Sequence, residues 1–94
     1  MYDIIINVNS KQKRTLNDVF YNPVKSSILW TDIESLFKAL GAYIEEGSGS
    51  RVCVLLNGIA AVFHRPHPRK ETDKGAVKSV RHFLINAGVY HDEL

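Results

Sequence analysis

Cysteine and proline are rare in this sequence of 94 residues, and it has no long hydrophobic run. Cys53 is its only cysteine, which excludes an internal disulfide and leaves no zinc site with the usual Cys/His spacing. The longest apolar runs, residues 52–56 and 59–63, have five residues each and are too short to cross a bilayer. The N-terminus lacks the basic and long apolar segments of a signal peptide. We therefore expect a cytoplasmic protein with no membrane segment, no metal ion and no cofactor.

The composition is typical of one globular domain spanning residues 1–94. Hydrophobic residues make up 45% of the chain and charged residues 23%. The charge is unevenly distributed, because residues 51–82 contain seven cations and two anions, a net charge of +5 with the histidines neutral. Either a polyanionic partner or a solvated basic surface accounts for this excess.

Two helices are predicted in the first half of the chain. One runs from about residue 11 to residue 21 and ends at Asn22-Pro23, because the residue before a proline disfavours helical geometry. The other follows Thr31-Asp-Ile-Glu34, which has the pattern of a capping box, and ends at Gly41. Trp30 directly precedes it, and we expect this side chain to pack in the core, with base stacking as the alternative.

A β-hairpin is predicted in the centre of the chain. Residues 51–56 and 59–64 are β-rich and flank Asn57-Gly58, the strongest short signal for a hairpin. A two-residue turn places Arg51 opposite His64 at the open end, and six apolar residues then share the inner face. The more exposed outer face carries Arg51 and His64, together with Cys53, Leu55, Ala60 and Val62.

The remaining segments complete an α+β domain. Residues 42–46 are predicted to add a short strand, residues 47–50 a flexible loop and residues 65–73 an extended loop containing two prolines. A last helix begins near Asp73 or Lys74 and ends at Gly88. This order predicts a small three-stranded antiparallel sheet with helices on one face. Residues 4–6 could form an edge strand, a dimer contact or a loose tail.

Three segments occur in a distinctive order: WTDIESLFKALG at residues 30–41, EGSGSR at residues 46–51 and KGAVKSVRHFLINAG at residues 74–88. The pattern covers residues 30–89 and resembles the HicA family of toxins from prokaryotic type II toxin–antitoxin modules. The resemblance implies an α-β-β-β-α fold similar to double-stranded-RNA-binding domains, with residues 1–29 as an N-terminal extension containing a short helix. It also implies ribosome-independent cleavage of mRNA, and neutralisation by a HicB antitoxin that covers the active surface.

The sequence departs from this family at the catalytic signature. The family's usual signature is Gly-Ser-His, with the imidazole at the start of the second strand, whereas the matching residues here are Gly49-Ser50-Arg51. Either this chain is not a nuclease, or its imidazole comes from elsewhere. The predicted hairpin register offers His64, which lies opposite Arg51.

Metal-free RNA cleavage needs a group that accepts the 2′-hydroxyl proton, a group that protonates the leaving oxygen and a cation for the charge that develops on the phosphate. Imidazole suits proton transfer because its ordinary pKa lies near neutral pH. We hypothesise that His64 supplies the imidazole, that Arg51 stabilises phosphate charge and that His67 is a second proton-transfer group. The alternative is that both histidines are polar residues without a catalytic role.

RNA contacts are predicted where cations gather in the second half of the chain. Long cationic side chains bind phosphates independently of sequence, and free amides at a helix start also attract phosphate. The candidates, with a serine from the glycine loop, are Ser50, Arg65, Arg69, Lys70, Lys74, Lys78 and Arg81. A solvated helix face and a merely flexible glycine loop are the alternatives.

The sequence as a whole predicts a HicA-like toxin that acts as a metal-independent mRNA endoribonuclease and is neutralised by a HicB-like antitoxin. A non-catalytic RNA-binding module of the same fold is one alternative. A protein-interaction domain that uses the exposed apolar face of the hairpin is another, because something is expected to cover such a face.

Overall fold

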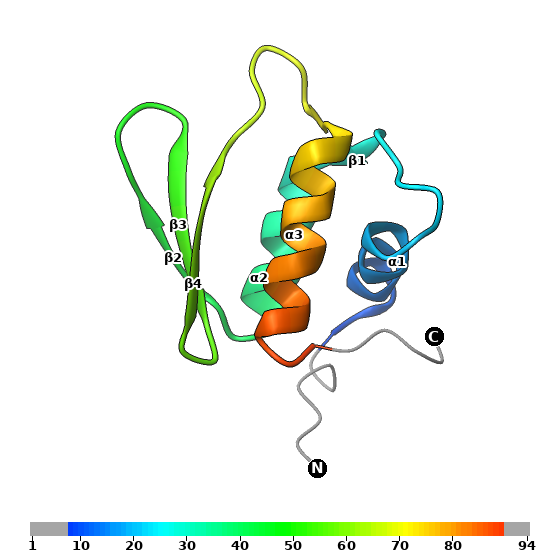
Figure 1. The fold of residues 1–94 in the computed structure, drawn as a ribbon, viewed down its shortest axis with the longest axis horizontal. Helices are drawn as coiled ribbons and strands as arrows, with labels where there is room; N and C mark the ends of the chain where they lie inside the picture. The colour runs from blue at the N-terminus through cyan, green and yellow to red at the C-terminus, as the bar shows by residue number, and fades with distance from the viewer. Residues whose placement is uncertain (1–7, 90–94) are drawn as a thin grey trace.

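A computed structural model describes residues 8–89, and its three longer helices all lie on one side of a small sheet (Figure 1). The elements are α1 (Ser10–Val19), β1 (Ile28–Leu29), α2 (Trp30–Ala39), β2 (Tyr43–Glu46), β3 (Arg51–Leu56), β4 (Ile59–His64), β5 (Glu71–Thr72) and α3 (Lys74–Asn86). Strands β2, β3 and β4 form the predicted three-stranded antiparallel sheet, and α2 and α3 cover one of its faces. The predicted α+β class is therefore confirmed. Residues 4–6 lie outside the described residues.

The hairpin has the predicted register. Leu56 pairs with Ile59 and Arg51 pairs with His64, with every intermediate pair as expected from a two-residue turn. The turn residues Asn57 and Gly58 have φ angles of 53° and 80°, which is the left-handed geometry that an Asn-Gly hairpin turn requires. Because side chains alternate between the faces of a strand, this register decides which residues face the helices.

The core lies between the sheet and the helices. Val52, Val54, Leu56 and Phe63 are buried on the inner face of the sheet. Four aromatic rings meet there with centroids 5.5–6.3 Å apart, which is the range of favourable aromatic contacts. They belong to Trp30, Phe37, Phe63 and Phe83. The prediction that Trp30 packs in the core is confirmed, since it is 4% exposed.

Helix α1 packs against α2 and α3 on the side away from the sheet (Figure 1). Asn9 and Gln12 form a capping box at its start, which was not predicted from the sequence. Leu16 and Val19 are fully buried in the same core as the sheet residues. The N-terminal extension thus adds a helix to the domain core.

The predicted capping box at the start of α2 is wrong. The helix begins at Trp30, and its N-cap residue Leu29 makes no side-chain capping hydrogen bond. Thr31 is exposed, and the Glu34 carboxylate instead accepts hydrogen bonds from the Trp30 indole and from Arg65. Glu34 therefore binds Arg65, which is distant in the sequence, and does not take part in the predicted capping box with Thr31.

A second small sheet was also missed. Ile28 pairs with Thr72 and Leu29 with Glu71, and the Trp30 amide donates to the Lys70 carbonyl. This ladder ties the start of α2 to a segment predicted only as a loop. Two-residue strands are too short to show an alternating pattern in the sequence.

Among residues 8–89, no helix has both the length and the hydropathy needed to cross a bilayer.

Candidate functional site

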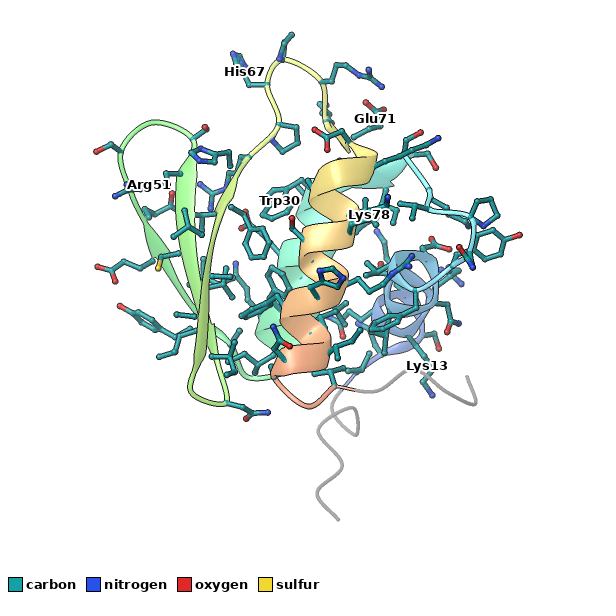
Figure 2. The ribbon with its side chains drawn as sticks, viewed as in Figure 1. Lys13, Trp30, Arg51, His67, Glu71 and Lys78 are labelled. Atoms are coloured by element: carbon teal, nitrogen blue, oxygen red, sulfur yellow. The ribbon has the colours of Figure 1, made fainter. Side chains whose placement is uncertain are left out.

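The outer face of the sheet carries a guanidinium and an imidazole at the open end of the hairpin. Arg51 begins β3, His64 ends β4, and both side chains are exposed. Because the two residues are directly paired, their Cβ atoms are about 4.5–5.5 Å apart. Figure 2 shows Arg51 on the side of the sheet away from the helices. The sequence predicted this juxtaposition, and the structure confirms the pairing.

A pocket of about 340 Å³ opens beside Arg51 on this face. It is lined by Glu45, Glu46, Gly47, Arg51, Cys53 and Val62. A Cβ atom at residue 47 would lie 3.0 Å from Arg51 Nε and 3.2 Å from the Arg51 carbonyl oxygen. Glycine at position 47 therefore leaves room for the guanidinium.

The glycine loop between β2 and β3 is held by backbone hydrogen bonds. The Gly47 amide donates to the Arg51 carbonyl at 2.8 Å, and the Arg51 amide donates to the Ser48 carbonyl at 3.1 Å. The Ser50 carbonyl accepts from the Arg65 amide at 2.9 Å, which extends the hairpin ladder by one pair. The loop thus fixes where β3 begins, although it was predicted only as a flexible connection.

His67 is placed apart from the pair of Arg51 and His64. It lies in the segment between β4 and β5, at the top of the view in Figure 2. It lines a different pocket, of about 350 Å³, together with Ser26, Pro66, Pro68, Arg69, Glu71 and Asp73. The structure therefore brings together only two of the three predicted catalytic residues.

Arg65 is held between two carboxylates on the inner side of the sheet. Its Nε lies 2.6 Å from Glu34 Oε2, its Nη1 lies 2.6 Å from Glu46 Oε1, and its Nη2 contacts both carboxylates. These hydrogen bonds lower the pKa of Glu46 and raise the pKa of Arg65. We call Glu34, Glu46 and Arg65 the carboxylate clamp.

The clamp joins three elements at the end of the sheet where the outer-face pair lies. Glu34 comes from α2, Glu46 ends β2 and Arg65 directly follows His64 at the end of β4. The Glu34 side chain is 15% exposed, and it also accepts a hydrogen bond from the Trp30 indole. The clamp therefore fixes the chain on both sides of the hairpin's open end.

The remaining predicted RNA contacts fall into two groups. Arg81 is half-buried, and it donates from Nε to the Val19 carbonyl at 3.0 Å and from Nη2 to the Tyr21 carbonyl at 2.8 Å. It thereby binds the end of α1 to α3. Four cations are exposed on α3 and the segment before it: Arg69, Lys70, Lys74 and Lys78.

Sequence reasoning missed the acidic residues of this region. Nothing in the sequence beyond their charge indicated that Glu34 and Glu46 belong to the site, because their partner Arg65 is 31 and 19 residues away in the chain. Glu45 was detectable, since alternation along residues 42–46 places residues 43 and 45 on one face of the strand. Within the described part of the chain, no group of three or more His, Cys, Asp or Glu residues is arranged to hold a metal ion.

Comparison with known proteins identifies one family. The family model described as the HicA toxin of bacterial toxin–antitoxin systems matches residues 30–89. These residues contain α2, the three-stranded sheet and α3. Neither a curated protein nor a solved structure matches the chain.

Proposed function

The chain belongs to the HicA toxin family of bacterial toxin–antitoxin systems, and from this premise we propose that it cleaves mRNA in the cytoplasm without a metal ion. The pairing of Arg51 with His64 on the exposed face of the sheet supports this proposal best. It places an imidazole directly opposite residue 51, where arginine stands in place of the family's signature histidine.

In the proposed reaction, His64 moves a proton while Arg51 binds the phosphate that is attacked. A guanidinium presents several fixed donors to phosphate oxygens, and it stays charged at every physiological pH. An imidazole can accept or donate a proton near neutral pH. Placing the two groups side by side on a rigid hairpin aligns them before the substrate binds, which lowers the entropic part of the barrier.

RNA would be held in part by the exposed cations Arg69, Lys70, Lys74 and Lys78. They lie on α3 and on the segment that connects it to β4, so they extend from the hairpin's open end along the molecule. Cationic contacts to phosphates are independent of base sequence, so these residues would add affinity for RNA whatever its bases.

We propose that a HicB-like antitoxin neutralises the toxin by covering the outer face of the sheet. Tyr43, Leu55 and Val62 are 62%, 44% and 53% exposed on this face, beside Arg51 and His64. Large side chains exposed together are typical of a surface that a partner covers. The same observation favours the second candidate function, a protein-interaction domain without catalytic activity.

The decisive experiment incubates the purified protein with mRNA in the presence of a chelator. We expect cleavage by the wild type and at least a 100-fold lower rate for His64→Ala or Arg51→Ala, as is usual when a proton-transfer or oxyanion-stabilising group is lost. His82→Ala is the matched control, because His82 is an exposed imidazole on α3.

The outcomes separate the candidates. Undiminished cleavage by His64→Ala removes His64 from the mechanism. RNA retention without cleavage by the wild type favours a non-catalytic binding module, and no retention at low salt favours the interaction domain. Growth arrest on expression, relieved by an antitoxin encoded beside the toxin, supports neutralisation.

A further inference from the structure

The two adjacent glutamates at the end of β2 have different environments. Side chains alternate along a strand, so Glu46 points toward the inner side and Glu45 toward the outer face. Glu46 is bound by Arg65 in the carboxylate clamp. Glu45 is exposed, lines the outer-face pocket with Arg51 and makes no ion pair with another described residue.

The outer face places Arg51 between Glu45 and His64. Glu45 pairs with Cys53, and Cys53 pairs with Val62, so these three residues form one row across the sheet. Arg51 and His64 form the next row toward the open end of the hairpin. Arg51 is therefore diagonal to Glu45 and directly opposite His64, on the middle strand of the three.

The separation of the two outer residues fits a phosphodiester bound between them. Two strand spacings of about 4.8 Å and two residue steps of about 3.4 Å put their Cα atoms about 12 Å apart. In the reacting group, the attacking oxygen, the phosphorus and the leaving oxygen lie in line. With one hydrogen bond added at each end of this line, the distance from the proton-accepting atom to the proton-donating atom is about 10 Å. A phosphate on the Arg51 guanidinium would thus have a carboxylate on one side and an imidazole on the other.

From this arrangement we infer that Glu45 is a second catalytic residue, the proton acceptor that works with His64. The inference rests on the proposed RNA cleavage. Displacement at phosphorus proceeds with the attacking and leaving oxygens roughly in line, so the proton acceptor and the proton donor must lie on opposite sides of the phosphate. Glu45 and His64 meet this requirement, whereas His67 lines a separate pocket.

The proposed step is a transesterification that needs no other reactant. The 2′-oxygen forms a bond to phosphorus as its proton passes to the Glu45 carboxylate. The bond from phosphorus to the 5′-oxygen breaks as the His64 imidazolium gives that oxygen a proton. The products are a 2′,3′-cyclic phosphate and a free 5′-hydroxyl, and Arg51 neutralises the charge that develops on the phosphate.

Other titratable groups on this face are less well placed for the step. Cys53 lies between Glu45 and Val62, one row away from Arg51 and His64. Tyr43 lies one row further away, opposite Leu55. Glu46 also lines the pocket with Arg51, but its carboxylate is bound by Arg65. Glu45 is thus the carboxylate of β2 in this pocket that is not engaged by Arg65.

The test measures kcat and KM for a short RNA across a pH series with a chelator present. For the wild type we expect a bell-shaped profile whose rising acidic limb reports ionisation of the carboxylate. Glu45→Gln should lower kcat by about 100-fold to 10,000-fold, change KM little and remove the acidic limb. Glu45→Asp should retain the limb at a reduced kcat, which shows that the carboxylate is needed.

Asp18→Asn is the matched control, since it removes a carboxylate on α1, which packs on the side of the helices away from the sheet. It should keep the acidic limb. An intact limb and a kcat within about threefold of wild type for Glu45→Gln would overturn the inference. If Glu45→Gln stays active while His64→Ala is inactive, the catalytic role of Glu45 is overturned and the proposed RNA cleavage by His64 stands. If the folded wild type does not cleave RNA, the proposed function fails and the inference fails with it.

Discussion

Arg65 was predicted to bind phosphate, but in the fold it binds carboxylates of the protein itself. Its position in a basic segment predicted a phosphate contact, but its guanidinium is hydrogen-bonded to Glu34 and Glu46 in the carboxylate clamp. Arg81 is similarly bound to backbone carbonyl groups at the end of α1. Phosphate binding by these two arginines stays a prediction, and it would require new partners for donors that are already used.

The clamp makes the stability of the fold depend on pH. Because Arg65 lowers the pKa of Glu46 in the folded state, the contribution of Glu46 is complete above the ordinary glutamate pKa of about 4.3. It is lost as the pH falls through the lowered pKa of the folded state. We expect the free energy of unfolding to decrease more steeply below about pH 5 for the wild type than for Glu46→Gln, in urea titrations at a series of pH values.

An Arg65→Gln background supplies the control for this prediction. Without the guanidinium, Glu46→Gln should no longer change the slope of stability against pH, because the two residues act as one pair. Equal slopes for the wild type and Glu46→Gln would show that the clamp contributes nothing to acid sensitivity.

At the level of elements, the hairpin turn decides the geometry of the whole outer face. A shift of one residue in the register would send His64 to the inner side and separate it from Arg51. The turn is also tied to the helices, because Asn57 Nδ2 donates to the Ala87 carbonyl at 2.7 Å. The register is therefore supported both by the local turn and by the end of α3.

Replacing Gly58 with alanine tests the importance of this turn. Gly58 has a φ of +80° and open space around it, so an added methyl group is strained only by the backbone conformation. We expect Gly58→Ala to lower the free energy of unfolding by about 1–2 kcal/mol in urea denaturation.

Gly75→Ala is the comparison variant for the turn. Gly75 lies in the first turn of α3, where an added Cβ would meet Asp73 Oδ1 at an ordinary 3.4 Å. This change should be neutral or stabilising by up to about 1 kcal/mol, because alanine favours a helix. Similar losses in both variants would indicate that the positive φ of Gly58 is unimportant.

Across the whole molecule, the fold distributes the positive charge of residues 51–82 unevenly. Arg65 and Arg81 bind internal partners, whereas Arg69, Lys70, Lys74 and Lys78 remain exposed. Figure 2 shows Arg51 on the sheet and Lys78 on α3, on different sides of the segment that carries His67.

Salt dependence of RNA binding tests the contribution of the exposed lysines. We expect a His64→Ala background to prevent cleavage under the proposed mechanism. In that background, replacing Lys74 and Lys78 with alanine should reduce the slope of log affinity against log salt. The expected reduction is about 0.7 for each lysine, the value for single-stranded nucleic acid. The measurement is a fluorescence titration with a short RNA at several salt concentrations.

Lys13→Ala provides the reference for nonspecific charge effects. Lys13 is exposed on α1, away from the other labelled cations in Figure 2. It should leave the salt slope close to that of the background protein. If removing Lys13 lowers the slope as much as removing Lys74 or Lys78, RNA binding follows net charge and has no defined surface.

The features predicted correctly are those that neighbouring residues specify. Asn57-Gly58 selects a two-residue turn, and the alternation of the flanking strands then places Arg51 beside His64 on the outer face. The last helix begins at Lys74, as predicted, and the Asp73 side chain there accepts a hydrogen bond from the amide of Ala76, three residues away. Each of these interactions acts over a few residues, so the order of the chain contains the necessary information.

The rest required the folded chain, because its partners meet only after distant segments pack together. Thr31-Asp-Ile-Glu34 has a capping pattern, but burial beside Trp30 and the charge of Arg65 gave Glu34 a better set of hydrogen bonds. Burial of the inner face likewise left Glu45 exposed and Glu46 within reach of Arg65. Local pattern specified the strands and their register, whereas packing specified which of the charged groups remain available to a substrate.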